Sequence, residues 1–139
     1  MFRAERAIIQ RLDEEVVGLK TCGSMSLLAS SRDMTDLLPG IFVGPGSGDI
    51  TEGGRGYGVT GILQSWSVTI IVPHWRTVRG DSSAAQLAGP FMMAVLAALE
   101  GWSPGTGFEP MVFEGYGAPV GNAGWAAFDM DFSLQFSFP

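Results

Sequence analysis

Few side chains in this sequence are of the types that carry out catalysis, and the single histidine is the first to consider. His74 could act as a general base, but it stands beside Trp75 and Arg76 with no cysteine or carboxylate at useful spacing. The single cysteine, Cys22, has neither a basic neighbour nor a partner histidine, so we interpret it as a small buried hydrophobe. Neither residue predicts nucleophilic or acid–base catalysis.

Two carboxylates and a glycine-rich loop are the remaining candidates for a binding site. Asp129 and Asp131 alternate onto one face of a predicted strand and could bind a cation together, but no third acidic partner is near in sequence. The segment 44–61 is rich in glycine, yet it lacks the lysine and hydroxyl pair of a phosphate-binding loop, and no helix follows it directly. We therefore expect no enzyme activity, no metal and no cofactor.

The composition and charge of the whole chain indicate the class of protein to which these residues belong. The chain has 139 residues, of which 46% are hydrophobic and 16% charged, which predicts one globular domain over residues 1–139. No window reaches eighteen apolar residues and the first eleven residues lack an apolar signal core, so we expect neither a membrane span nor a secretion signal. All eight basic residues precede residue 80, and the rest of the chain is acidic, which argues against a nucleic-acid-binding surface there.

The element that must organise the fold is the final stretch, 125–138. Its residues alternate, with one apolar set (Ala126, Phe128, Met130, Phe132, Leu134, Phe136, Phe138) and one polar set that contains Asp129 and Asp131. Leaving five or six large apolar side chains in water would cost roughly 1.5–3 kcal/mol each, so this face must be covered. The polar set favours an antiparallel sheet with one wet face.

Other segments of the chain are predicted to form the helices that cover this apolar face and the strands that pair beside it. Apolar residues three and four apart predict a helix over 2–19, and the segment 83–99 predicts a second, almost wholly apolar helix that should be mostly buried. We predict strands at 22–29, 41–43, 62–72 and 111–116, a helical turn at 32–38, and pairing of 41–43 with 62–72 across the glycine loop. The predicted fold is α+β, a single domain with a mostly antiparallel sheet and both long helices packed on one face.

One segment resembles a known family. The run from Asp81 to Pro90 leading to Leu96-Ala97-Ala98-Leu99-Glu100-Gly101-Trp102-Ser103-Pro104 is similar to the second helix of bacteriophage tail terminator proteins, where an apolar helix ends in a Gly-Trp-x-Pro-like turn. The order of elements agrees over most of the chain, and the similarity at the level of a motif covers Leu96 to Pro104.

The resemblance implies a structural virion protein, made in the host cytoplasm and placed at the head-proximal end of the tail. It implies a homohexameric ring that caps the completed tail tube, stops polymerisation of the tube protein and presents the surface to which a head completion or connector protein docks. DNA would pass through such a ring without specific binding. Ring closure requires heterologous contacts, in which one patch meets a different patch of the next subunit.

Charge and loops then suggest residues for these roles. Acidic side chains that face a channel would keep it from adhering to DNA, and we expect this of Glu114, Asp129 and Asp131. Candidates for contacts with the tube or a neighbouring subunit lie on the predicted loops: Asp49, Glu52, Arg55, Tyr57, Arg76 and Arg79.

Two other functions fit the same sequence. The chain could be another neck or tail-completion component, which would bind the head portal instead of the tube end. It could also be a small-ligand-binding domain with a pocket under the 44–61 loop. The lack of histidine, cysteine and acidic clusters argues against this second alternative.

Overall fold

Two long strands form the centre of the structure. In the computed structural model, which describes residues 3–31, 34–46, 51–53, 61–73, 81–121 and 124–137, β4 (Gly61–Pro73) and β7 (Trp125–Ser137) pair antiparallel along their whole length. Trp66 lies opposite Phe132, and Val68 lies opposite Met130. Large side chains on both strands therefore project from the same face and pack side by side.

The other strands extend this pair on both sides. The remaining elements are α1 (Arg3–Glu15), β1 (Thr21–Ser24), α2 (Met25–Ser30), the 3-10 helix η1 (Met34–Leu37), β2 (Gly40–Pro45), β3 (Thr51–Gly53), α3 (Asp81–Leu99), β5 (Val112–Tyr116) and β6 (Val120–Gly121). The sheet has the order β1-β2-β4-β7-β5, with β3 paired to β4 and β6 paired to β7. Only the β1–β2 pair is parallel, among the strands described. The predicted α+β fold with a mostly antiparallel sheet is confirmed.

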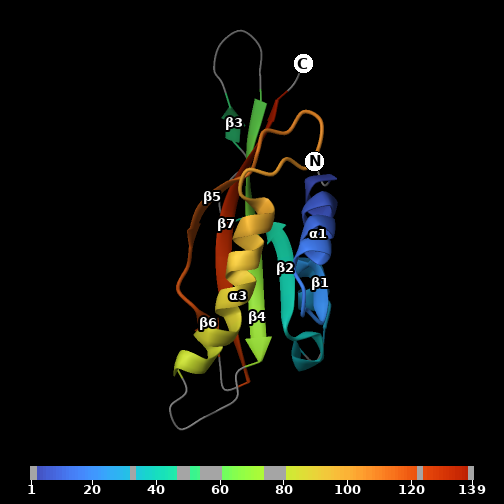
Figure 1. Cartoon of the computed structure of the whole chain (residues 1–139). Coiled ribbons are helices and arrows are strands. Elements are labelled where there is room, and N and C mark those ends of the chain that lie inside the picture. The colour runs from blue at the N-terminus through green and yellow to red at the C-terminus, as the bar shows by residue number, and fades with distance from the viewer. Residues whose placement is uncertain are drawn as a thin grey trace.

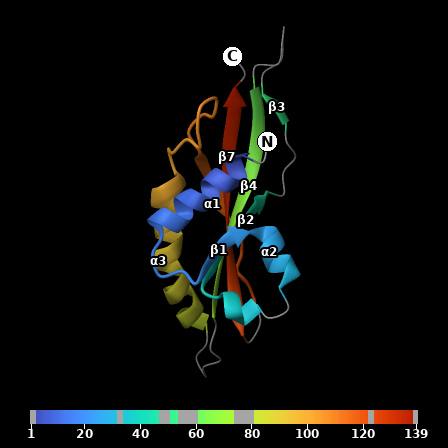
Figure 2. The same cartoon turned by 90° about the vertical axis from the view of Figure 1, so that its right-hand side faces the viewer.

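Both long helices lie on one face of this sheet, as predicted (Figures 1 and 2). Three residues of α1 spaced by four, Ala4, Ile8 and Leu12, are fully buried against the sheet and α3. The helix ends at Glu15, four residues earlier than predicted, and Gly18 follows it with a φ of +89°, a left-handed conformation that favours glycine. The second helix continues through Gly89-Pro90 as one element.

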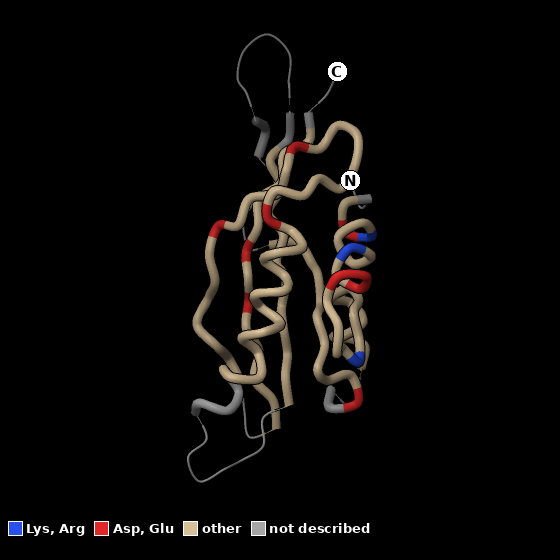
Figure 3. The backbone as a smooth tube through the Cα atoms, in the orientation of Figure 1, with Lys and Arg blue, Asp and Glu red and all other residues tan. Residues whose placement is uncertain are grey.

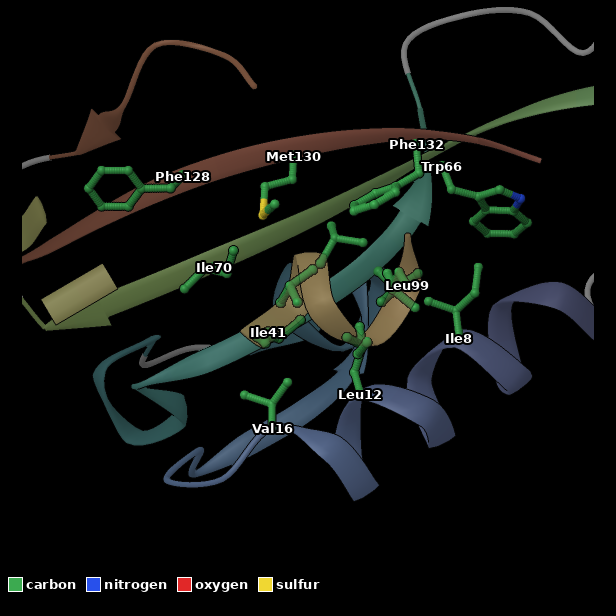
Figure 4. Packing of buried hydrophobic residues seen from close by; sticks show 14 of the residues in the cluster. Ile8, Leu12, Val16, Ile41, Trp66, Ile70, Leu99, Phe128, Met130 and Phe132 are labelled. Carbon is green, nitrogen blue, oxygen red and sulfur yellow. The ribbon is translucent and has the colours of Figure 1, made fainter. Parts of the chain in front are cut away.

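The core lies between these helices and the sheet (Figure 4). Ile41, Ile70 and Phe132 are fully buried there, together with Leu99 from α3. The rings of Phe132 and Phe113 are 5.4 Å apart between centroids, with an interplanar angle of 55°. The apolar alternation of the last strand is thus satisfied by one continuous core.

The opposite face of the sheet carries a helix that the sequence analysis missed. The predicted strand over 22–29 is wrong beyond Ser24, because the chain turns into α2, and Met25 and Leu28 of this helix pack near the buried Phe42 and Ile71. The short helix α2 and the turn η1 also connect β1 to β2, which a parallel pair requires. One corner of the second face is therefore covered, and the remainder carries polar residues together with the exposed Leu63 and Val112.

Candidate functional site

The polar remainder of the second face carries three carboxylates. Asp129 and Asp131 project from β7 on the side away from the two long helices, as their spacing of two residues predicts. Glu114 reaches the same side from β5, where it lies at a β-bulge between Phe113 and Gly115. We call the surface formed by Glu114, Asp129 and Asp131 the acidic sheet face.

Hydroxyl groups of neighbouring residues hold two of these carboxylates. The Thr69 Oγ1 on β4 donates to Asp129 Oδ1 at 2.5 Å, and the Ser133 Oγ donates to Glu114 Oε1 at 2.7 Å. Asp131 lies opposite Ser67 on β4 and Gly115 on β5. These neutral partners orient the carboxylates and leave their charge uncompensated.

No basic residue lies on the strands that form this edge of the acidic sheet face. The sequence has no lysine or arginine after residue 79, so β5, β6 and β7 carry none. Figure 3 shows acidic positions along β5 and β7, whereas the described lysine and arginine positions lie on the α1 side, where further acidic positions accompany them. Among the described residues, no group of three His, Cys, Asp or Glu side chains could hold a metal ion. The face is therefore a source of negative potential, which repels a polyanion.

Most of the loop residues expected to contact the tube or a neighbour lie outside the described residues. This is the case for Asp49, Arg55, Tyr57, Arg76 and Arg79, and also for His74. The backbone of Glu52 lies in β3, opposite Ile62 of β4. The role that we expect for these residues stays a prediction.

Cys22 is held in an environment that suppresses its reactivity. The thiol is half-buried and donates to the carbonyl oxygen of Ile9 at 3.6 Å. Burial, and after it the nearby Asp13 carboxylate, raises the pKa of the Cys22 thiol from 9.0 to about 11. Because the thiolate is the nucleophile, this residue is inert near neutral pH.

The turn that resembles the family motif joins three elements. Gly101 has a φ of +78°, which ends α3, and its N–H donates to the Met111 carbonyl oxygen ahead of β5. Arg11 of α1 donates from Nε to the Ala98 carbonyl oxygen at 3.0 Å, and its guanidinium lies 5.5 Å from the centroid of the Trp102 ring. The motif thus fixes α1 against the end of α3.

The sequence analysis also missed several exposed apolar side chains. The expectation that α3 is mostly buried is wrong for one side of the helix, where Leu87 and Met93 are exposed, and Tyr116 and Val120 are exposed on the neighbouring edge of the sheet. One signal was present in the sequence, because no charged residue occurs between Asp81 and Glu100. A helix that is apolar on every side needs more cover than one sheet provides.

These features define a structural assembly module whose distinctive parts are surfaces: an acidic sheet face, an apolar helix side and two sheet edges. No helix in the described part of the chain is long and apolar enough to cross a membrane.

The family model described as "Phage tail terminator protein" matches residues 1–139, and the chain belongs to this family. It is therefore a structural protein of the virion tail, as the resemblance implied. A chain from a solved structure described as "Virion of native gene transfer agent (GTA) particle" shares the fold, with a TM-score of 0.65, 19% identity, and coverage of 96% of this chain and 94% of that chain. No curated protein matches the sequence.

Proposed function

We propose that this protein caps the head-proximal end of the phage tail tube as a homohexameric ring. The ring stops polymerisation of the tube protein and presents the surface to which a head completion or connector protein docks. Family membership over the whole chain supports this function. The mechanism is steric, because an occupied tube end offers no site for the next tube subunit.

The acidic sheet face is the structural observation that carries the proposal. In a ring that DNA must cross, Glu114, Asp129 and Asp131 face the lumen and repel the phosphate backbone, so that the channel does not retain DNA. Three carboxylates on one exposed face, with no base on their strands, support this orientation.

The loop residues complete the proposed arrangement. Asp49, Glu52, Arg55, Tyr57, Arg76 and Arg79 contact the tube or a neighbouring subunit. Reversing the charge of Arg76 and Arg79 should then impair capping, whereas intact capping by that variant would argue against the role of these two residues.

Tail length in particles made without this chain is the decisive test. A tail terminator predicts overlong tubes that remain unjoined, alongside filled heads without tails, in electron micrographs. Tails of normal and uniform length that still join heads would contradict the capping function. Binding of the purified chain to the head portal, and not to the tube end, would instead identify another neck component.

A further inference from the structure

Among the described residues, five of the eight exposed large apolar side chains lie at one edge of the sheet. Leu87, Met93, Val112, Tyr116 and Val120 lie at the edge formed by α3, β5 and β6, which we call the β5 side. Val17 follows α1 and lies close in sequence to the opposite edge strand, β1. Figure 1 shows that β5 and α1 with β1 bound the molecule on opposite sides.

The β5 side is apolar and well exposed. The exposed fractions are 67% for Met93, 72% for Tyr116 and 62% for Val120. Tyr116 lies opposite Met130, whose side chain points toward α3, so Tyr116 emerges on the same side of the sheet as this helix. Val112 and Val120 lie opposite Ser133 and Ala127, so they emerge on the other side of the sheet at the same edge. Exposed apolar side chains that gather along one sheet edge are typical of protein–protein contacts.

The opposite edge, which we call the β1 side, offers a complementary surface. Val17 is 85% exposed, and the exposed Lys20 lies directly before β1. On the β5 side the charged residues among those described are acidic, including Glu100 and Glu114. The β1 side carries charges of both signs, because the described bases lie there together with several acids: Arg3, Arg6, Arg11 and Lys20, with Glu5, Asp13, Glu14 and Glu15. A contact between two β5 sides would bring acids against acids, whereas a β5 side against a β1 side brings Lys20 toward carboxylates.

The strands at both edges are also available for a partner. β1 and β5 end the described sheet, and each pairs with one strand only in the part of the chain that the structure describes. Unpaired sheet edges are a common site of association between chains. The exposed apolar side chains, the charged residues and the edge strands that have one partner in the described sheet therefore lie on the same two surfaces.

We infer that the β5 side of one copy packs against the β1 side of a second copy in a head-to-tail contact. The two surfaces differ, so the contact is heterologous and repeats from copy to copy, which closes a ring when the rotation permits. This inference deepens the proposed function, on which it rests, by naming the surfaces that join the ring subunits.

The single lysine of the chain makes this contact testable in assembled tails. A carbodiimide joins an amine to a carboxylate in direct contact, and Lys20 is the only side-chain amine. Lys20 and Glu114 lie at opposite ends of a five-strand order, roughly 19 Å apart at about 4.8 Å per strand, so an amide between them must join two copies.

We expect mass spectrometry of treated tails to identify Lys20 linked to Glu114, which lies on the edge strand β5. The Lys20→Arg variant keeps the charge but removes the amine, and should lose the linkage. Links from Lys20 only to acids near α1, or no linked copies in tails that contain the chain, would overturn the inference.

Substitutions provide a second test that does not depend on the reagent. Met93→Glu and Tyr116→Glu place a charge in the apolar contact and should give overlong tails with no linked copies. Leu63→Glu is the matched control, because Leu63 is 40% exposed on the central strand β4 and lies on neither side. Normal tails from the Met93 and Tyr116 variants would refute the contact.

The two proposals fail in different ways. Normal tail length in particles that lack the chain would refute the capping function. Tails that require the chain, but in which Lys20 is not linked to the β5 side, would refute only the head-to-tail contact.

Discussion

Charge reversal on the acidic sheet face tests whether this face lines the DNA channel. Replacing Asp129 and Asp131 with lysine removes two negative charges and adds two positive ones, which changes the net charge of −6 by +4. The fold should survive, because both side chains are part-exposed and only the Thr69–Asp129 hydrogen bond is lost. That loss costs about 1–2 kcal/mol, well below the roughly 5–15 kcal/mol that stabilises a typical domain.

The two new lysines should create measurable affinity for DNA. If each neutralises one phosphate, the logarithm of the binding constant falls with the logarithm of salt concentration with a slope of about −1.8. Raising the salt from about 50 to about 200 mM should then weaken binding about twelvefold. Fluorescence anisotropy with a double-stranded oligonucleotide measures this slope on the free protein.

The rate of DNA ejection from purified particles tests the location of the face. Asp129→Lys with Asp131→Lys should slow ejection, because lysines in the channel retain the phosphate backbone. The matched control is Asp13→Lys with Glu14→Lys, which adds the same charge on the exposed side of α1. An unchanged ejection rate for the β7 variant, or equal slowing by the α1 variant, would refute the lumenal position.

Four further predictions concern stability and reactivity. Phe132→Ala should lower the free energy of unfolding by about 3–5 kcal/mol in chemical denaturation, because Phe132 is fully buried and packs on Phe113. A loss below about 1 kcal/mol would contradict this packing. Gly101→Ala should lower the free energy of unfolding by about 1–2 kcal/mol through the positive φ of this residue alone, since nothing lies within 4 Å of the added Cβ. Equal melting temperatures for variant and wild type would contradict this loss of stability. Cys22 should react with iodoacetamide about a hundredfold more slowly than an unperturbed thiol at pH 8, because its pKa is raised to about 11; fast labelling of the native protein would show that the thiol is not protected. The same raised pKa means that the contribution of Cys22 to stability is complete below pH 9 and is lost as the pH rises from about 9 to about 11, so a Cys22→Ser variant should lose less stability over that range.

Elements whose apolar pattern is strong and local can be predicted from the sequence. The alternation from Ala126 to Phe136 defines a strand with one buried face, and the apolar spacing of Ala4, Ile8 and Leu12 defines a helix that needs a sheet to cover. These patterns predict the α+β class and place Asp129 and Asp131 on one face, because side-chain direction in a strand has a period of two residues.

The way in which separate segments meet depends on packing between elements that are distant in the sequence. The segment 25–30 is helical because Met25 and Leu28 pack near Phe42 and Ile71, and their contact with β2 and β4 is not visible in the local alternation. The position of Glu114 beside Ser133 likewise depends on the bulge in β5. The apolar pattern of α3 shows that the helix needs cover, but the width of the sheet beneath it decides which side stays exposed. That exposed side and the two edge strands of the described sheet are the surfaces that we propose for contacts with other copies.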